Sequence, residues 1–232
     1  MTTAVITGGT KGIGRSLCQL FVAAGYNVAT CSRNQDDLHL LKQELSHHNA
    51  EILVQKADLS KKNEIAAFAS FIHESWSHVD ILVNNAGIFI PGSILDEADG
   101  NLENMMSINL YSVYYLSRHL VPMMAERGSG HIFNICSVAS IEAYPNGGSY
   151  SISKHALLGF SKCLREELKG KGVKVTSVIP GATWTHSWEG ADFPEDRLMQ
   201  AEDVAKTIIG AYQLGPSAVV EEILIRPQLG DL

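Results

Sequence analysis

Short apolar runs alternate along this chain with longer stretches in which apolar residues recur at helical spacing. The short runs predict strands at residues 3–7, 27–31, 52–56, 79–83, 131–137, 173–179 and 219–225. The longer stretches predict helices at residues 12–24, 36–47, 61–76, 102–127 and 202–212, and another that ends near Gly170. Alternation of this kind is typical of βαβ units, so we expect an α/β fold with a doubly wound parallel sheet. The strands are apolar throughout, as a sheet covered by helices on both faces requires.

Nothing in this pattern divides the chain. It has no internal repeat, no low-complexity segment and no linker rich in Pro, Gly or Ser. We therefore expect residues 1–232 to form one domain, and a composition that is 45% hydrophobic supplies one large core.

Charge and cysteine content argue against several classes of protein. The net charge is −7 with acids and bases interspersed, whereas a nucleic-acid partner would require a basic patch. The four cysteines form no CxxC pair, so we expect neither a disulfide framework nor a metal site. No apolar run approaches the ~18 residues of a membrane span, and the first residues lack the basic start of a signal peptide. These features predict a cytoplasmic protein that does not bind membranes.

Tyr150 and Lys154 stand four residues apart in a predicted helix, which places both side chains on one face. A cation beside a phenol favours the phenolate and draws its pKa toward the neutral range. Such a phenol can donate a proton to a carbonyl oxygen or take one from an alcohol. Pairs at this spacing also occur by chance on solvated helix faces, so the pair gains its meaning from the other motifs.

A glycine-rich turn, Thr7-Gly8-Gly9-Thr10-Lys11-Gly12-Ile13-Gly14, follows the first strand and opens the first helix. Glycines let the backbone approach a phosphate, and the helix N-terminus offers free N–H groups and a positive dipole end. The spacing of Gly8, Gly12 and Gly14 is longer than that of the GxGxxG fingerprint. Its place after the first strand of a βαβ unit predicts a dinucleotide site rather than a plain connection.

The end of the second strand indicates which dinucleotide fits. A site for the unphosphorylated cofactor needs an acid about 20 residues after the turn. This chain has Ser32 and Arg33 there instead. Arg33, together with Lys11 of the turn, suits a 2′-phosphate, so we expect NADP(H) as the cofactor. The alternative is that both cations are ordinary surface residues.

The turn is one of four motifs that occur in a fixed order. The others are Asn84-Asn85-Ala86-Gly87 after the fourth strand, Ser137 at the end of the fifth, and Tyr150-x-x-x-Lys154. With these motifs the chain resembles the short-chain dehydrogenase/reductase family over essentially its whole length. The resemblance implies a Rossmann-like parallel sheet of seven strands in the order 3-2-1-4-5-6-7, with helices on both faces.

The resemblance also implies roles for particular residues. Tyr150 is implied as the acid/base, and Lys154 as the residue that grips the nicotinamide ribose and lowers the pKa of Tyr150. Ser137 would hold the substrate carbonyl, and Asn109 would help to carry a water-linked proton relay. Taken alone, Asn109 and Ser137 read as ordinary structural polar residues. The residues implied for the cofactor, besides Tyr150 and Lys154, are Gly8, Thr10, Lys11, Gly12, Ile13, Gly14, Ser32, Arg33, Asp58, Leu59, Asn85, Ala86, Gly87, Pro180, Gly181 and Thr185.

Aromatic rings gather in the stretches expected to line the substrate pocket. The substrate-binding candidates besides Ser137 are Tyr144, Trp184 and Trp188, with Phe89, Ile90, His186 and Phe193 as further wall residues. Such a pocket suits a flat or aromatic carbonyl compound, because stacking and apolar contacts dominate there. For each ring alone, plain packing is an equal alternative.

We therefore expect an NADPH-dependent carbonyl reductase of a small-molecule substrate. One alternative is a 3-oxoacyl-carrier-protein reductase, which would need a basic patch for its acidic partner. The substrate loop is instead acidic, with only Arg197 against Glu189, Asp192, Glu195 and Asp196. A second alternative is a non-catalytic NADP-binding sensor, which would have no need of Tyr150. Family members commonly pair through the helices that bear Asn109 and Tyr150, so a homodimer or homotetramer is expected.

Overall fold

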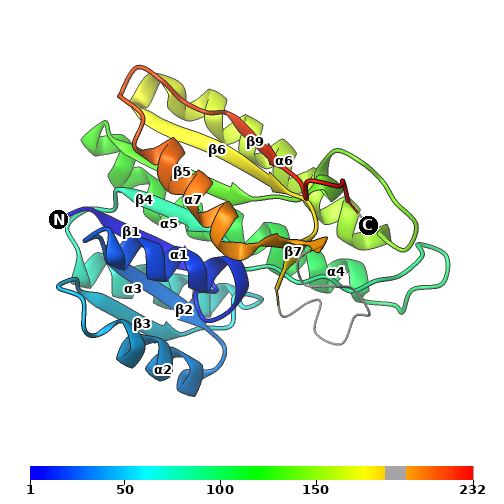
Figure 1. Ribbon diagram of the computed structural model, residues 1–232, viewed down its shortest axis with the longest axis horizontal. Helices are drawn as coiled ribbons and strands as arrows, with labels where there is room; N and C mark the ends of the chain where they lie inside the picture. The colour runs from blue at the N-terminus through cyan, green and yellow to red at the C-terminus, as the bar shows by residue number, and fades with distance from the viewer. Residues whose placement is uncertain (186–196, 232) are drawn as a thin grey trace.

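The computed structural model describes residues 1–185 and 197–231. Its main sheet has seven parallel strands in the order β3-β2-β1-β4-β5-β6-β9. Because β9 is the seventh strand predicted from the sequence, the expected order 3-2-1-4-5-6-7 is confirmed. The chain crosses from one half of the sheet to the other between β3 and β4, next to β1 (Figure 1).

The elements alternate along the chain as the hydrophobic pattern predicts. The strands of the main sheet are β1 (Thr3–Thr7), β2 (Asn27–Ser32), β3 (Ile52–Lys56), β4 (Ile81–Asn84), β5 (Gly130–Ile135), β6 (Val173–Pro180) and β9 (Glu222–Ile225). The helices are α1 (Gly12–Ala23), α2 (Gln35–Leu45), α3 (Lys62–Ser75), α4 (Asn101–Met106), α5 (Ser112–Arg127), α6 (Gly148–Leu168) and α7 (Ala201–Tyr212). Short 3-10 turns, η2 (Val138–Ser140) and η3 (Lys169–Lys171), flank α6.

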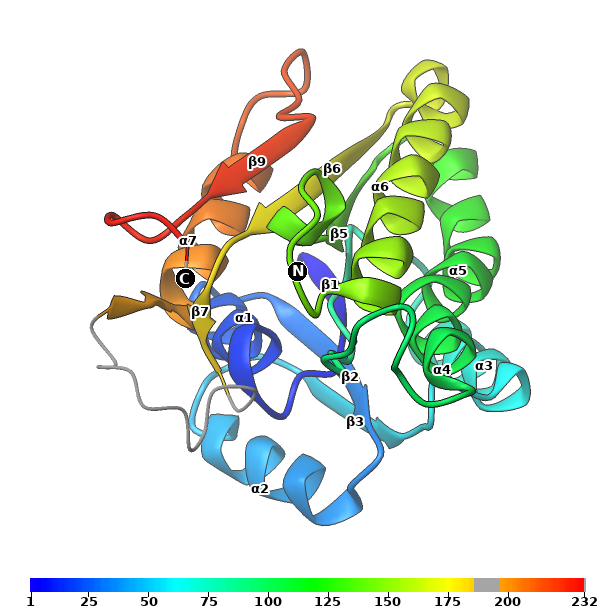
Figure 2. The same cartoon turned by 90° about the vertical axis from the view of Figure 1, so that its right-hand side faces the viewer.

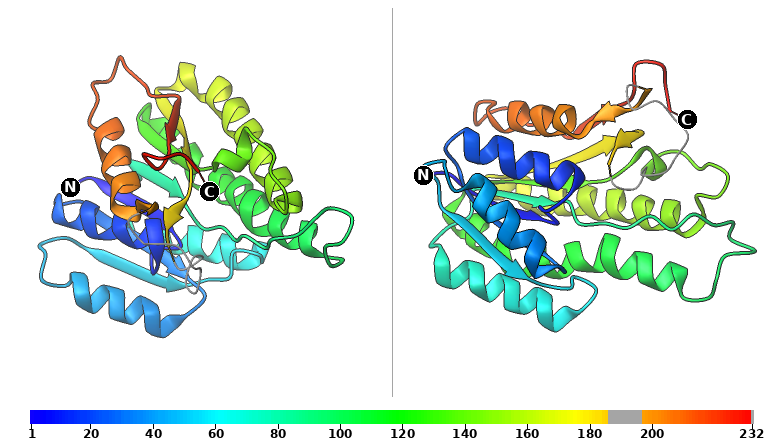
Figure 3. Two further views of the ribbon diagram at one scale, coloured as in Figure 1. Left: turned by 45° about the vertical axis from the view of Figure 1, so that its right-hand side comes forward. Right: turned by 60° about the horizontal axis from the view of Figure 1, so that its bottom comes forward.

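Helices cover the sheet on both faces, which explains why its strands are apolar throughout. Alternate side chains of β1 serve the two layers: Ala4 and Ile6 pack beneath α1, α2 and α7, whereas Val5 packs against α3 and α5. The two helical layers lie on opposite sides of the sheet (Figure 3). A buried strand side chain thus has a partner on whichever face it points to.

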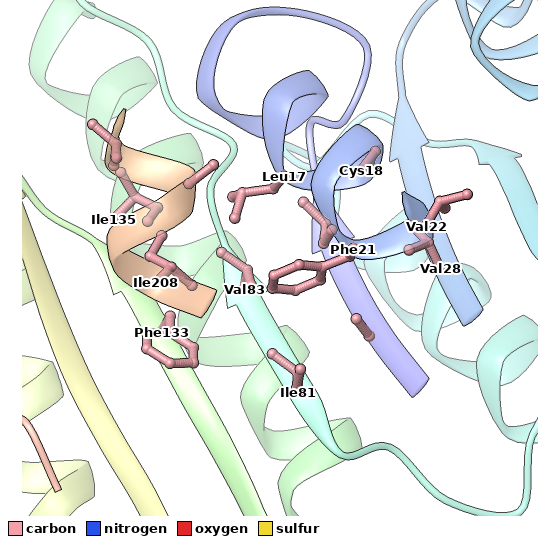
Figure 4. Packing of buried hydrophobic residues seen from close by; sticks show 14 of the residues in the cluster. Leu17, Cys18, Phe21, Val22, Val28, Ile81, Val83, Phe133, Ile135 and Ile208 are labelled. Carbon is pink, nitrogen blue, oxygen red and sulfur yellow. The ribbon is translucent and has the colours of Figure 1, made fainter. Parts of the chain in front are cut away.

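The core below α1 is tightly filled. Leu17 and Phe21 of α1 are fully buried and meet Ile81 and Val83 of β4 and Ile208 of α7 (Figure 4). The spacing of Leu17 and Phe21 places them on one helical face, which is the amphipathic pattern visible in the sequence. This packing holds the N-terminus of α1, and hence the glycine turn, against the sheet.

Three local features differ from the sequence predictions. The helix expected over residues 102–127 is divided by a π-helical segment, η1 (Ser107–Tyr111), and the last strand starts at Glu222 rather than at residue 219. A small parallel pair, β7 (Thr183–Trp184) with β8 (Met199–Gln200), was not predicted. Pairs of two residues carry no periodic signal, and a π segment of five residues is too short to show a spacing of its own. Within the described part of the chain, no helix is long and apolar enough to cross a membrane.

Candidate active site

The carboxyl ends of all the central strands meet at one edge of the sheet (Figure 2). Because the strands are parallel, the residues that follow each of them are brought together there. The predicted site residues that directly follow a strand, or lie close behind its end, are Gly8 after β1, Arg33 after β2, Asp58 after β3, Asn85 after β4, Ser137 after β5 and Gly181 after β6.

Gly8, Gly12 and Gly14 are required by the geometry of the turn. Gly8 and Gly12 have positive φ values of 69° and 51°, which other residues rarely adopt. A Cβ atom on Gly14 would lie 2.2 Å from the carbonyl oxygen of Gly8 and 2.4 Å from Asn85 Nδ2. That amide nitrogen donates to the carbonyl oxygens of Thr7 (2.8 Å) and Gly8 (3.3 Å). Asn85 was expected only as a residue that lines the cofactor site. In the structure its side chain also stabilises the glycine turn.

The turn also requires a glycine at residue 9, which was not among the residues predicted for the cofactor site. Its backbone N–H donates to Thr30 Oγ1 at 3.0 Å, and a Cβ atom there would lie 2.3 Å from that oxygen. Thr30 in turn donates to the carbonyl oxygen of Ile6. The adjacent glycines Gly8-Gly9 were the available signal. Of the remaining turn residues, Lys11 is exposed, Thr10 is half-buried, and Ile13 packs against the core below α1.

The loop after β6 reaches back to this turn. Thr185 lies beside Gly12, where a Cβ atom on the glycine would be 3.1 Å from Thr185 Cγ2. Pro180 is the last residue of β6, and the N–H of Gly181 donates to the carbonyl oxygen of Ile225 at 2.8 Å. The structure therefore brings the loop predicted to meet the nicotinamide next to the loop predicted to hold the phosphates.

The end of β2 carries the charge expected for a 2′-phosphate. Arg33 is exposed, and among the described residues neither Arg33 nor Lys11 has an ion-pair partner. The hydroxyl of Ser32 donates to the carbonyl oxygen of Asn34 and so shapes the turn that presents Arg33. Asn34 caps α2 by accepting from two backbone N–H groups.

Asp58 and Leu59 follow β3 on the same side. Burial acts to raise the pKa of Asp58, but hydrogen bonds from Ser60 and the charges of Lys61 and Arg33 outweigh it, so the pKa lies below its ordinary value. Asp58 is therefore an anion at neutral pH. The Leu59 side chain packs in the core between the sheet and the layer of α3 and α5.

Lys154 is buried on α6 with its ammonium group inside the site. Its side chain is 5% exposed and Nζ donates to the carbonyl oxygen of Ile135 at 2.8 Å. Burial lowers the pKa of Lys154 to about 8. Nζ lies 5.7 Å from the ring centroid of Tyr150, so the predicted pairing of the two side chains on one helical face is present.

The pKa of Tyr150 differs from the sequence prediction. Burial raises it, and hydrogen bonding with the Ser137 side chain opposes that rise only in part. The net direction is therefore opposite to the lowering expected from the Tyr150-x-x-x-Lys154 pair, because loss of hydration on burial is the largest cause. At neutral pH the Tyr150 phenol is accordingly protonated and able to donate.

Ser137 lies two residues beyond the end of β5, in the N-terminal capping position of the η2 turn. Its hydroxyl accepts from the N–H of Ala139, and its own N–H donates to Ser140 Oγ. Residue exposure is 9%, and the side chain is close enough to Tyr150 to affect its pKa. Ser137 thus caps the η2 turn and also lies beside Tyr150, while its role toward a substrate carbonyl stays a prediction.

Asn109 lies in the π-helical segment, a feature that often marks functional sites. It is fully buried, and its amide accepts from the N–H of Ile88 and donates to the carbonyl oxygen of the same residue. It also donates to Ser153 Oγ at 2.9 Å, and Ser153 donates to the carbonyl oxygen of Tyr150. Sequence analysis missed Ser153, since a serine in a helix gives no specific signal.

Gly87 marks the point where these groups converge. A Cβ atom on Gly87 would lie 3.2 Å from Asn109 Oδ1 and 3.6 Å from Lys154 Nζ. Its neighbour Ala86 donates its N–H to Thr7 Oγ1 at 2.9 Å, as does Asn85. The Asn84–Gly87 motif thus connects the glycine turn directly to the side chains around Tyr150.

Aromatic rings stand on the exposed side of Tyr150. The Phe89 ring packs edge-to-face on the Tyr150 ring with centroids 4.9 Å apart. Burial and the neighbouring Tyr150 raise the pKa of Tyr144 to about 12. Phe89 and Tyr144 nevertheless expose 43% and 41% of their surface. Trp184 lies in β7, whereas the predicted wall residues Trp188, His186 and Phe193 fall outside the described residues.

Comparison with known proteins agrees with this arrangement. A family model described as short chain dehydrogenase matches residues 2–193. Sepiapterin reductase of Chlorobaculum tepidum is 33% identical to this chain over 98% of the chain and 97% of that protein. A metagenomic short-chain oxidoreductase in complex with NADP has a TM-score of 0.86 at 28% identity, covering 98% of this chain and 97% of that one.

A second solved structure has the same fold along its whole length. L-sorbose reductase from Gluconobacter frateurii, in complex with NADPH and L-sorbose, has a TM-score of 0.90 at 25% identity. The match covers 97% of this chain and 95% of that one. With four motifs in order, the expected sheet and a family model over most of its length, this chain belongs to the short-chain dehydrogenase/reductase family of oxidoreductases.

Proposed function

We propose that the protein is an NADPH-dependent reductase that converts a carbonyl compound to the alcohol, with Tyr150 as the general acid. The observation that carries the proposal is the convergence of Tyr150, Ser137, Lys154 and Asn109 beside the glycine turn. A protonated phenol, a neighbouring hydroxyl and a buried ammonium form a set that can polarise and protonate one carbonyl oxygen.

The residues at the turn fit a phosphorylated dinucleotide. Gly8 and Gly14 lack a Cβ where one would crowd the backbone, Gly12 lacks one where it would meet the Thr185 side chain, and the N-terminus of α1 would hold the phosphates. Arg33 and Lys11 would bind a 2′-phosphate through charge-assisted hydrogen bonds. Asp58 would lie by the adenine, and Thr185 by the carboxamide of the nicotinamide. The structures of similar proteins in complex with NADP or NADPH support this choice.

When bound, the reduced nicotinamide supplies the hydride, and the protein supplies orientation and the proton. Tyr150 donates its phenolic proton to the carbonyl oxygen as negative charge develops there. Ser137 aims its hydroxyl at the same oxygen and stabilises that charge. The Lys154 ammonium stabilises the resulting phenolate. Asn109 holds the Gly87–Ile88 backbone, which lies next to Lys154 Nζ.

We assign the substrate to flat, ring-bearing carbonyl compounds. Phe89 and Tyr144 expose ring surface beside Tyr150, and stacking on such surfaces favours planar substrates. The name of one relative, sepiapterin reductase, agrees with a ring-bearing carbonyl. Two further proposals go with this one: a homodimer or homotetramer in solution, and a place in the cytoplasm.

The 3-oxoacyl-carrier-protein reductase remains the second enzymatic candidate, and its main discriminating segment lies outside the described residues. The non-catalytic sensor would bind NADP without turnover. The buried Lys154 opposes the sensor, because a buried cation is costly to keep where it has no chemical task.

One assay separates these functions. Oxidation of NADPH and of NADH is followed in parallel with aromatic ketones, vicinal diketones, a pterin carbonyl and an acetoacetyl thioester. We expect NADPH consumption on the ring-bearing carbonyls. Turnover of the thioester alone would identify the carrier-protein reductase, and cofactor binding without any turnover would identify the sensor.

The matched variant is Tyr150→Phe, which removes only the phenolic oxygen. We expect its turnover to fall by at least about 100-fold, in line with the loss of a general acid, while NADPH binding is unchanged. Equal turnover in Tyr150→Phe and in the wild type would refute the mechanism.

A further inference from the structure

The residues after β9 turn back over the loop that follows β6. This C-terminal tail, residues 226–231, has a turn in which the N–H of Gly230 donates to the carbonyl oxygen of Pro227 at 2.9 Å. Gly230 has a positive φ of 82°, which lets the chain reverse there. The tail therefore ends at the carboxyl edge of the sheet, next to β7 (Figure 2).

Asp231 contacts the backbone of the β6–β7 loop directly. Its Oδ1 accepts from the N–H of Ala182 at 3.0 Å. A Cβ atom on Gly181 would lie 2.0 Å from the same oxygen, so the contact exists only because residue 181 is glycine. No positive φ requires a glycine at this position, and the atoms that a Cβ there would meet all belong to Asp231.

Charged neighbours fix the Asp231 carboxylate in place. Arg226 Nη1 lies 3.1 Å from Asp231 Oδ2, and the other end of that guanidinium pairs with Glu142 in the loop before α6. The Asp231 side chain is only 22% exposed, so this pair is better shielded than an ordinary surface ion pair. One arginine thus connects the tail to the loop that carries Tyr144.

The tail also contacts Arg197, which lies just before β8. Arg197 donates to the carbonyl oxygens of Gly230 at 2.9 Å and Asp231 at 3.4 Å. Next to it, the N–H of Met199 donates to the carbonyl oxygen of Ala182 at 3.1 Å. The tail therefore anchors the chain both where β7 begins and just before β8.

From this geometry we infer that Asp231 is a positioning residue for the nicotinamide end of the cofactor site. It orients the Gly181–Ala182 backbone, and through it Thr185, which lies beside Gly12 of the glycine turn. The inference rests on the proposed cofactor site, because the nicotinamide is assigned to this loop. It concerns the nicotinamide half only, since within the described residues no hydrogen bond or ion pair joins Asp231 to the glycine turn, to Arg33 or to Asp58.

Binding measurements can separate the two halves of the cofactor. NADPH and adenosine 2′,5′-bisphosphate, which lacks the nicotinamide half, are titrated into wild type, Asp231→Ala and Asp231→Asn. We expect Asp231→Ala to weaken NADPH binding by about 3- to 10-fold, the range for loss of one hydrogen bond. Binding of the bisphosphate should change less than about twofold. Asp231→Asn keeps an acceptor for Ala182 and should recover part of the loss.

The control is Asp203→Ala, which removes an exposed carboxylate from the first turn of α7 and should leave both affinities unchanged. Equal weakening of both ligands by Asp231→Ala, or no weakening of NADPH, would overturn the inference. If the wild type does not bind the bisphosphate, the NADP assignment is wrong. The titrations are then repeated with NADH and ADP. Asp231→Ala should weaken the binding of NADH more than the binding of ADP.

Gly181→Ala gives an independent test. The added methyl group must displace the Asp231 carboxylate, so Gly181→Ala should weaken NADPH binding as Asp231→Ala does. In the double variant the two losses should not add, because both act through one contact. Full additivity would show that Gly181 and Asp231 affect the site separately, and would also overturn the inference.

Discussion

Lys154 Nζ donates a hydrogen bond to the carbonyl oxygen of Ile135, the last residue of β5, at 2.8 Å. This contact joins α6, which carries Tyr150, to the central strand whose continuation carries Ser137. It is the one hydrogen bond of the Lys154 ammonium within the described residues, so the charge is buried with little compensation. The site therefore holds a cation at a cost to stability, and that cost can be measured.

Replacement of Lys154 by Met should reveal this cost through its pH dependence. The pKa of Lys154 is lowered to about 8, whereas in an unfolded chain it is about 10.4. Below pH 8 both states carry the proton, so the penalty on the folded state is complete. Between about pH 8 and 10.4 the unfolded state alone binds the proton, so wild-type stability rises with pH.

At pH 7 the free energy of unfolding of Lys154→Met should consequently exceed that of the wild type by about 1–3 kcal/mol. This difference in stability should disappear as the pH rises toward about 10.4. Urea denaturation at the two pH values measures it. A difference between the two proteins that is independent of pH would contradict the prediction. Turnover by the variant should be lost at every pH.

Asn109→Ala should reduce both stability and turnover. Its amide satisfies the N–H and the carbonyl oxygen of Ile88 and also contacts Ser153, so truncation leaves several buried polar groups unpaired. We expect a loss of about 2–4 kcal/mol in the free energy of unfolding. Asn134 is the matched control, because it is equally buried and its amide contacts Asn84 and Ser161. Asn134→Ala should lower stability alike but retain kcat; loss of kcat in both variants would remove the special role of Asn109.

Gly14→Ala should damage the glycine turn. The new methyl group would meet the Gly8 carbonyl oxygen at 2.2 Å and Asn85 Nδ2 at 2.4 Å, and neither can move freely. We expect a loss of at least about 2 kcal/mol in stability together with a large loss of cofactor affinity. Gly210→Ala, on α7 with nothing within 4 Å of its Cβ position, should instead stabilise by about 0.5–1 kcal/mol. Calorimetry measures the thermal stability of the two variants. A Gly14→Ala protein as stable as the wild type would contradict the prediction, because the turn would then have room for the methyl group.

Arg33→Ala should change the choice of cofactor. If Arg33 binds the 2′-phosphate, kcat/KM for NADPH should fall by about 10- to 100-fold, while the value for NADH stays constant. Lys42→Ala, a change of the same charge on the exposed face of α2, serves as the control and should alter neither value. An equal fall with both cofactors would mean that Arg33 shapes the loop rather than binding phosphate.

Much of the fold could be predicted because it depends on local pattern. Strands of four to eight residues and helices with one apolar face repeat along the chain, and this alternation is typical of a parallel sheet covered by helices. The start of β9 and the division between α4 and α5 could not be predicted, because apolar residues precede Glu222 and a five-residue π segment is too short to show a spacing of its own. The pKa of Tyr150 was predicted with the wrong sign, since burial is a property of the assembled site and not of the Tyr150-x-x-x-Lys154 spacing.

The sequence by itself determined the order of the elements, the glycine turn and the pairing of Tyr150 with Lys154, because each depends on residues close together in the chain. Only the tertiary structure decided what lies around them. Asn85, which follows β4, donates to the Thr7 carbonyl oxygen of the glycine turn. The carbonyl oxygen of Ile135 in β5 accepts from the Lys154 ammonium, and Asp231 near the C-terminus accepts from the N–H of Ala182. These contacts join residues separated by 19 to 78 positions, and no local pattern encodes which distant groups the parallel sheet brings to one edge.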